Sequence, residues 1–179
     1  MYAEDEADAV PTSVSSVTDA GLQAQLYLSD RIIVPAEAMR DLDDLDATVN
    51  APSWGQTSWR AFRALHAYAS ALASSDDPGS FWSWCANSGH PLAWPATNKK
   101  LAMQESESVQ ANATLRNARV LPVSTSVSAD GTIYMGAHIK IAQGGGNLAP
   151  RIYFHVDGAN AQVHVGFFGP HKYMPNTKT

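Results

Sequence analysis

Residues 151–168 of the chain read RIYFHVDGANAQVHVGFF, and this stretch decides the fold of the second half of the molecule. In two segments on either side of residues 158–161, every second side chain is apolar. Strict alternation is typical of strands that bury one face. The four residues between the segments have the length of a hairpin loop. The stretch therefore predicts an antiparallel hairpin with one apolar face.

The loop length also predicts the register of this hairpin. A four-residue loop places Val156 opposite Val163, Phe154 opposite Val165 and Ile152 opposite Phe167. The same register places His155 directly across from His164 on the other face. Two imidazolium ions at that spacing repel, so the pKa of one histidine should fall below the ordinary value.

Two further strands are expected upstream of the hairpin. Residues 132–142 alternate in the same way, with Ile133, Met135, Ala137, Ile139 and Ile141 on one face. A three-residue loop at 129–131 would pair Val127 with Ile133 and Leu121 with Ile139. Residues 120–170 then form a four-stranded antiparallel β-meander.

The first half of the chain shows helical patterns instead. Between residues 53 and 117, apolar residues recur every three or four positions, most clearly at Trp59, Phe62, Leu65, Ala69 and Leu72. Residues 97–117 suit a partly exposed helix that leads into the sheet. We therefore expect the α+β class, with a helical N-terminal half packed on the meander in one domain of residues 21–179. Residues 1–20 read as an acidic, flexible tail.

Charge is distributed unevenly along the 179 residues. Residues 1–98 hold 4 basic and 13 acidic side chains, net −9, and residues 99–179 hold 8 basic and 4 acidic, net +4. A basic second half suits an anionic partner such as nucleic acid, although the two halves would also neutralise one another in the fold. The single cysteine, Cys85, allows no internal disulfide and favours a cytoplasmic setting. No apolar run is long enough to span a membrane.

The polar face of the expected sheet carries the candidate functional residues. Metal-free RNA cleavage needs a base and an acid that titrate near neutrality, together with cations that hold the phosphate. Histidine suits the first two tasks, arginine and lysine suit the third, and tyrosine can stack on bases. The candidate catalytic residues are His138, Arg151, His155 and His164. The candidate substrate-binding residues are Tyr134, Lys140, Tyr153, His171 and Lys172.

Other interpretations of these residues remain open. Zinc could lie among His138, His155 and His164, because imidazoles from adjacent strands form a known metal geometry. The histidines could equally be ordinary polar surface, or the face could bind nucleic acid without turnover. Glu105 is one of two acids in the 97–117 segment, where a solvated helix position and a general base are both conceivable.

The segment PRIYFHVDG at 150–158, followed by VHVGFF at 163–168 and then Lys172, resembles the closing strands of RelE/ParE-type toxins. In that family an arginine opens a strand of the type R-I-x-F, and the next strand ends in Gly-Phe and basic residues. The resemblance covers residues 120–179. It implies a small antiparallel sheet packed on helices, cleavage of ribosome-bound mRNA by many members, and phosphate-binding roles for Arg151 and Lys172.

These observations together predict a metal-independent endoribonuclease of toxin type that needs no cofactor. Its expected partners are RNA and a protein that is antitoxin-like or a complex subunit, with no membrane involved. The alternative function is a non-catalytic nucleic-acid- or protein-binding subunit of a multi-component bacterial system.

Overall fold

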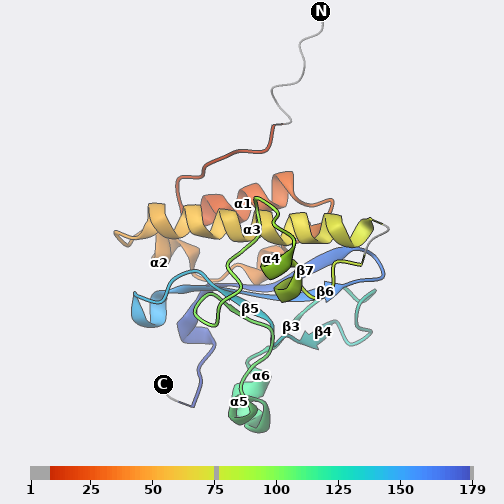
Figure 1. Cartoon of the computed structure of the whole chain (residues 1–179). Helices are drawn as coiled ribbons and strands as arrows, with labels where there is room; N and C mark the ends of the chain where they lie inside the picture. The colour runs from red at the N-terminus through yellow and green to blue at the C-terminus, as the bar shows by residue number, and fades with distance from the viewer. Residues whose placement is uncertain (1–8, 75–76, 178–179) are drawn as a thin grey trace, which may run out of the picture.

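A computed structural model describes residues 9–74 and 77–177 of the chain. Helices α1 (Val17–Tyr27) and α3 (Ala51–Ala73) lie side by side over one face of a central sheet (Figure 1). Short helices α5 (Glu107–Ala111) and α6 (Ala113–Asn117) lie on the opposite side, as does the C-terminal segment up to Thr177. The mixture of helices and sheet confirms the expected α+β class. No helix in the described part of the chain is long and apolar enough to cross a membrane.

The helical layer follows from the apolar pattern and from capping. The Ser16 side chain accepts from Asp19 N and caps α1, and Asp46 Oδ1 accepts from Val17 N at 2.8 Å. Helix α3 buries Trp59, Phe62 and Leu65, as the periodicity predicted. Helix α1 begins at Val17, whose side chain is fully buried, so its first turn lies within residues 1–20. Residues 1–8 lie outside the described part.

The central sheet has five strands in the order β1-β7-β6-β5-β2. These are β1 (Ile32–Ile33), β2 (Leu101–Ala102), β5 (His138–Lys140), β6 (Pro150–Asp157) and β7 (Gln162–Pro170). Strand β1 pairs with β7 in parallel, and the other pairs are antiparallel. The predicted four-stranded antiparallel meander is therefore wrong, because strands from distant parts of the chain complete both edges.

The predicted hairpin register is correct from its loop to the middle of the strands. Val156 pairs with Val163, His155 with His164 and Phe154 with Val165. A β-bulge at Gly166 then shifts the register, so Ile152 pairs with Phe168 and not with Phe167. A Cβ on Gly166 would lie 2.5 Å from Met135 Sδ and 2.9 Å from Leu121 Cβ, so this position requires glycine.

The bulge changes which phenylalanine reaches the main core. Phe168 packs under the helices with Ile152 and Phe154, and its ring meets Phe62 edge-on at 5.0 Å. Phe167, expected on that face, lies on the other one in a smaller apolar cluster with Tyr153. An extra residue in one strand reverses the alternation beyond it, which the even spacing of the sequence concealed.

The expected strand over residues 132–142 is broken in two. Its first part, β4 (Thr132–Tyr134), pairs with β3 (Val120–Pro122) in a separate two-stranded sheet, and its second part is β5. Leu121 pairs with Ile133 and not with Ile139, so the predicted three-residue loop is wrong. The break lies at Gly136, where a Cβ would press on the Gln104–Glu105 backbone. The Gln104–Glu105 segment packs close to Gly136 at this point, and the strand expected over residues 132–142 does not continue through it.

The remaining elements connect these layers. Residues 97–117 do not form the single helix expected, because Leu101 and Ala102 form the edge strand β2 beside β5. Helix α4 (Phe81–Asn87) packs its Phe81 ring on Phe154 at 5.6 Å. The short helical turns are η2 (Ala36–Ala38), α2 (Leu42–Asp46), η3 (Gly146–Leu148) and η4 (His171–Tyr173).

Candidate active site

A cavity of about 400 Å³ opens on the sheet face that the long helices leave uncovered. Strands β5 and β6 form its floor, and segments from three other parts of the chain form its walls. We call it the cationic pocket. It is lined by Ala102, Gln104, Glu105, Ser106, Ser108, Val109, Arg119, His138, Lys140, Gln143, Arg151, Tyr153, His171, Asn176 and Thr177.

Two like charges lie across from each other on the pocket floor. Lys140 in β5 pairs directly with Arg151 in β6. Lys140 Nζ donates to the Asn98 carbonyl at 2.8 Å, and Arg151 Nη1 donates to the carbonyls of Ala142 and Pro150. Among the described residues, neither cation forms an ion pair with a carboxylate. Like charges directly opposite each other destabilise a sheet. A bound anion would therefore stabilise this pair of cations.

Burial increases the free-energy cost of holding these two cations without an anion. Arg151 is only 8% exposed, and burial lowers the pKa of its guanidinium below the usual range. Burial, together with the charge of Arg151, likewise lowers the pKa of Lys140. Both shifts express the cost of cations held away from water, and a bound anion would reduce that cost.

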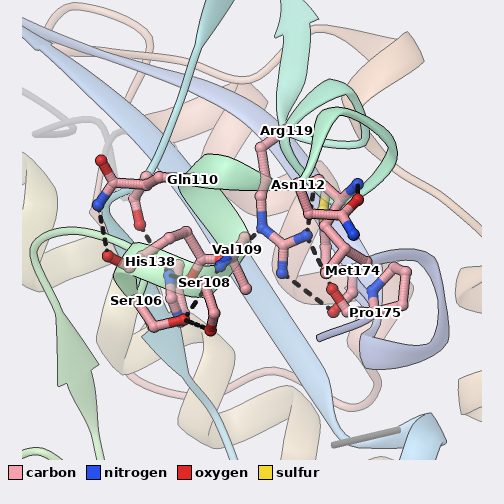
Figure 2. Close-up of polar contacts among 12 residues, drawn as sticks. Ser106, Ser108, Val109, Gln110, Asn112, Arg119, His138, Met174 and Pro175 are labelled. Atoms are coloured by element: carbon pink, nitrogen blue, oxygen red, sulfur yellow. Dashed lines mark hydrogen bonds and ion pairs between the residues drawn. The ribbon is translucent and has the colours of Figure 1, made fainter. Parts of the chain in front are cut away.

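Arg119 and Glu105 form a buried ion pair in the pocket wall. Arg119 Nε donates to Glu105 Oε2, and the two side chains are 2% and 9% exposed. Figure 2 shows the Arg119 guanidinium also pointing at the C-terminal segment, where it donates to the carbonyls of Pro175 at 2.9 Å and Met174 at 3.2 Å. Arg119 therefore fixes one wall of the pocket to the other.

Among the described residues, Glu105 is the only carboxylate that lines the pocket. Burial raises the pKa of its carboxyl, while the charge of Arg119 opposes that shift. Its Oε1 lies 3.5 Å from His138 Nδ1. A carboxylate whose pKa is raised by burial is better suited to accept a proton near neutral pH.

His138 lies flat against Tyr153, with ring centroids 4.5 Å apart and planes at 15°. Its Nδ1 is 2.9 Å from the Gly136 carbonyl, so Nδ1 carries a proton and donates it there. Burial lowers the pKa of His138 to about 3, with smaller contributions from the three pocket cations, while the Gly136 contact acts in the opposite direction. His138 is thus a neutral, oriented imidazole in the pocket wall.

His171 is the second imidazole of the pocket. It begins η4 directly after β7, and its backbone N–H donates to the Ala149 carbonyl at 3.0 Å. Burial and the charges of Arg151, Arg119 and Lys140 lower the pKa of His171 to about 4. An anion bound among those cations would offset their charge and raise this pKa again.

The structure brings together five of the nine residues proposed from the sequence. His138, Lys140, Arg151, Tyr153 and His171 all line the cationic pocket. Lys172 points elsewhere and forms an ion pair with Asp41 at 3.3 Å. Tyr134 lies in β4 under the guanidinium of Arg116, 4.8 Å from its ring centre.

His155 and His164 face each other outside the pocket, at the loop end of the hairpin. His164 is 5% exposed, and the pKa of its imidazole is lowered, chiefly by burial and slightly by His155. Asp157 acts in the opposite direction. In the described ranges no three His, Cys, Asp or Glu side chains come together as a metal site, so the zinc arrangement with His138 is not formed.

Sequence reasoning missed Arg119 and undervalued Glu105. In the sequence, Glu105 is distinguished only as one of two acids in its segment, and that pattern favours a solvated helix position. Arg119 precedes a short strand without any motif. The ion pair between Arg119 and Glu105 depends on the close packing of residues 104–106 against Gly136. No local sequence pattern predicts that packing.

Comparisons with known proteins give no relative for this chain. No protein family model matches it, and neither a curated protein nor a solved structure is significantly similar.

Proposed function

We propose that this chain is a metal-independent endoribonuclease and that the cationic pocket is its active site. The observation that carries the proposal is the Lys140–Arg151 cross-strand pair, which is partly buried and forms no ion pair with a carboxylate in the described part of the chain. A phosphodiester supplies the missing negative charge, and its oxygens accept the hydrogen bonds that a guanidinium and an ammonium donate.

The groups around this pair suit transfer of the phosphate to the 2′-oxygen. Glu105 takes the proton of the 2′-hydroxyl while that oxygen forms a bond to phosphorus. The bond from phosphorus to the 5′-oxygen of the next nucleotide breaks, and this oxygen receives a proton from His171. The products are a 2′,3′-cyclic phosphate and a 5′-hydroxyl, and Lys140 and Arg151 hold the phosphate oxygens throughout.

The protonation states follow from the charges in the pocket. Glu105 is held by Arg119 and lies on the same wall as His138. His171 is neutral while the pocket is empty, and it gains its proton once a phosphodiester offsets the three cations that lower its pKa. Binding of the substrate thereby protonates His171, which then acts as the acid.

The resemblance of residues 150–172 to RelE/ParE-type toxins supports the same function. An antitoxin-like protein partner and action on RNA in the cytoplasm belong to this proposal. We place the chemistry in the cationic pocket and not at His155 and His164, because the described residues that line the cavity beside His164 include Glu37 but no arginine or lysine to hold a phosphate.

Incubation of the purified protein with single-stranded RNA in EDTA tests the proposal. We expect fragments with 2′,3′-cyclic phosphate ends, and no cleavage of 2′-O-methyl RNA, which lacks the proton that Glu105 removes. Arg151→Ala and His171→Ala should each slow cleavage by about a hundredfold or more. His66→Ala, on the far helix α3, is the matched control.

Two outcomes would overturn the proposal in different ways. Loss of cleavage on His155→Ala, with retention on His171→Ala, would move the chemistry to the hairpin. Binding of RNA without any cleavage would leave the non-catalytic binding subunit as the function.

A further inference from the structure

A second hollow, of about 230 Å³, adjoins the cationic pocket at His171. It is lined by Asn147, His171, Lys172 and Pro175. His171 is the one side chain that both cavities share among their lining residues. A ligand in either cavity would therefore contact His171.

The hollow is lined by Lys172, whose side chain is held in place by its neighbours. Lys172 Nζ lies 3.3 Å from Asp41 and 5.2 Å from the ring centre of Tyr173. The Tyr173 hydroxyl also donates to Asp41, and Arg40 covers the same ring at 4.3 Å. These contacts tie η4 to the segment before α2, so that Lys172 and His171 keep their positions on neighbouring sides of one short turn.

The opposite edge of the hollow is held by η3. Its C-terminal neighbour Ala149 accepts from the His171 backbone N–H at 3.0 Å, which keeps Asn147 close to η4. The Asn147 side chain offers both a donor and an acceptor, as a nucleobase edge or a ribose requires.

We propose that this hollow binds the nucleotide that leaves on cleavage, so that the substrate is an RNA strand crossing η4 with its scissile phosphate beside His171. The inference rests on the proposed function. It assigns the nucleotide that supplies the 2′-hydroxyl to the cationic pocket and the nucleotide that carries the 5′-oxygen to the second hollow. An acid that donates to the 5′-oxygen must lie at the boundary between the two, as His171 does.

Binding of uncleavable ligands tests this subsite without requiring catalysis. A dinucleotide with a 2′-deoxyribose on its 5′ side should bind more tightly than the corresponding nucleoside 3′-phosphate, measured by calorimetry. Asn147→Ala and Lys172→Ala should each reduce that advantage by about fivefold, the equivalent of about 1 kcal/mol. Lys172→Arg should preserve it, and Lys99→Ala, which removes an exposed lysine outside both cavities, is the control.

The outcomes separate this inference from the proposed function. Equal binding of the two ligands, or an advantage that both variants keep, would overturn the subsite even if RNA is cleaved. A dinucleotide advantage that depends on Asn147 and Lys172, in a protein that cleaves no RNA, would sustain the subsite and overturn the nuclease.

Discussion

Two pairs of histidines lie on the same face of the sheet, and they differ in what surrounds them. His155 and His164 are placed by two adjacent strands alone. His138 and His171 come from β5 and η4, and the cationic pocket that holds them is closed by segments from five parts of the chain. Strand pairing brings histidines together in the first case, whereas tertiary packing brings them to cations and a carboxylate in the second.

The two pairs of histidines also differ in the charged groups around them. At the hairpin, Asp157 favours the charged form of His164, and the adjoining cavity of about 210 Å³ is mainly apolar. In the pocket, three cations disfavour the charged forms of both histidines. Proximity of two imidazoles is therefore insufficient for a phosphate site, because among the described residues arginine and lysine line the cavity at His138 and His171 and not the cavity at His164.

Removal of Arg119 should have the largest effect on stability. Arg119→Ala leaves Glu105 buried without its partner and breaks the link to the C-terminal segment, at a cost of about 3–5 kcal/mol. Urea unfolding measures the loss. Adding Glu105→Gln should restore part of it, because no buried charge then remains unpaired. A loss below about 1 kcal/mol would show that this pair does not hold the pocket wall.

Substitution of Gly166, at the β-bulge between the two regions, should have the next largest effect on stability. Gly166→Ala places a Cβ against Leu121 and Met135, and we expect it to lower the free energy of unfolding by about 1–3 kcal/mol. Gly158→Ala in the hairpin loop meets open space and should change it by less than about 0.5 kcal/mol. Equal effects of the two substitutions would contradict the bulge.

The pH dependence of stability should separate the two pairs. The pKa of His138 is about 3 in the folded chain against 6.5 in the unfolded chain, so the unfolded state binds the proton first. Its contribution is present above pH 6.5 and is lost as the pH falls toward 3, at up to about 1.4 kcal/mol per pH unit.

Denaturation between pH 4 and 7 provides the measurement. His138→Gln should flatten the decline at acid pH more than His164→Gln does, although the lowered pKa of His164 has the same sign. A decline that persists unchanged in His138→Gln would show that this imidazole is not held neutral.

The smallest effect is expected at the hairpin loop. Ala161 adopts a positive φ of 50°, a conformation that costs an L side chain about 1 kcal/mol and glycine almost nothing. Ala161→Gly should therefore stabilise the fold by about 0.5 kcal/mol after the entropy cost of glycine, as thermal unfolding would show. A destabilisation would mean that burial of the Ala161 methyl group outweighs the strain.

Local patterns predicted helix α3 and the loop end of the hairpin. The stripe of Trp59, Phe62 and Leu65 gave α3, and alternation with a four-residue loop gave the pairing of His155 with His164. The same reasoning failed at Gly166 and Gly136, because an extra residue or a break in a strand leaves the apolar spacing almost unchanged. It also missed β2, which is too short to show a pattern.

The sequence by itself determined which side chains share the polar face, because alternation along a strand is a property of the backbone. It placed Arg151, Tyr153 and His155 together and pointed to phosphate chemistry. Only the tertiary structure decided where on that face a site exists. Arg119, Glu105 and His171 reach the pocket through the contacts that join the segment around Glu105, Arg119 and the C-terminal segment. Charges from such distant segments act on one another through space, and their distances are fixed only when the chain has folded.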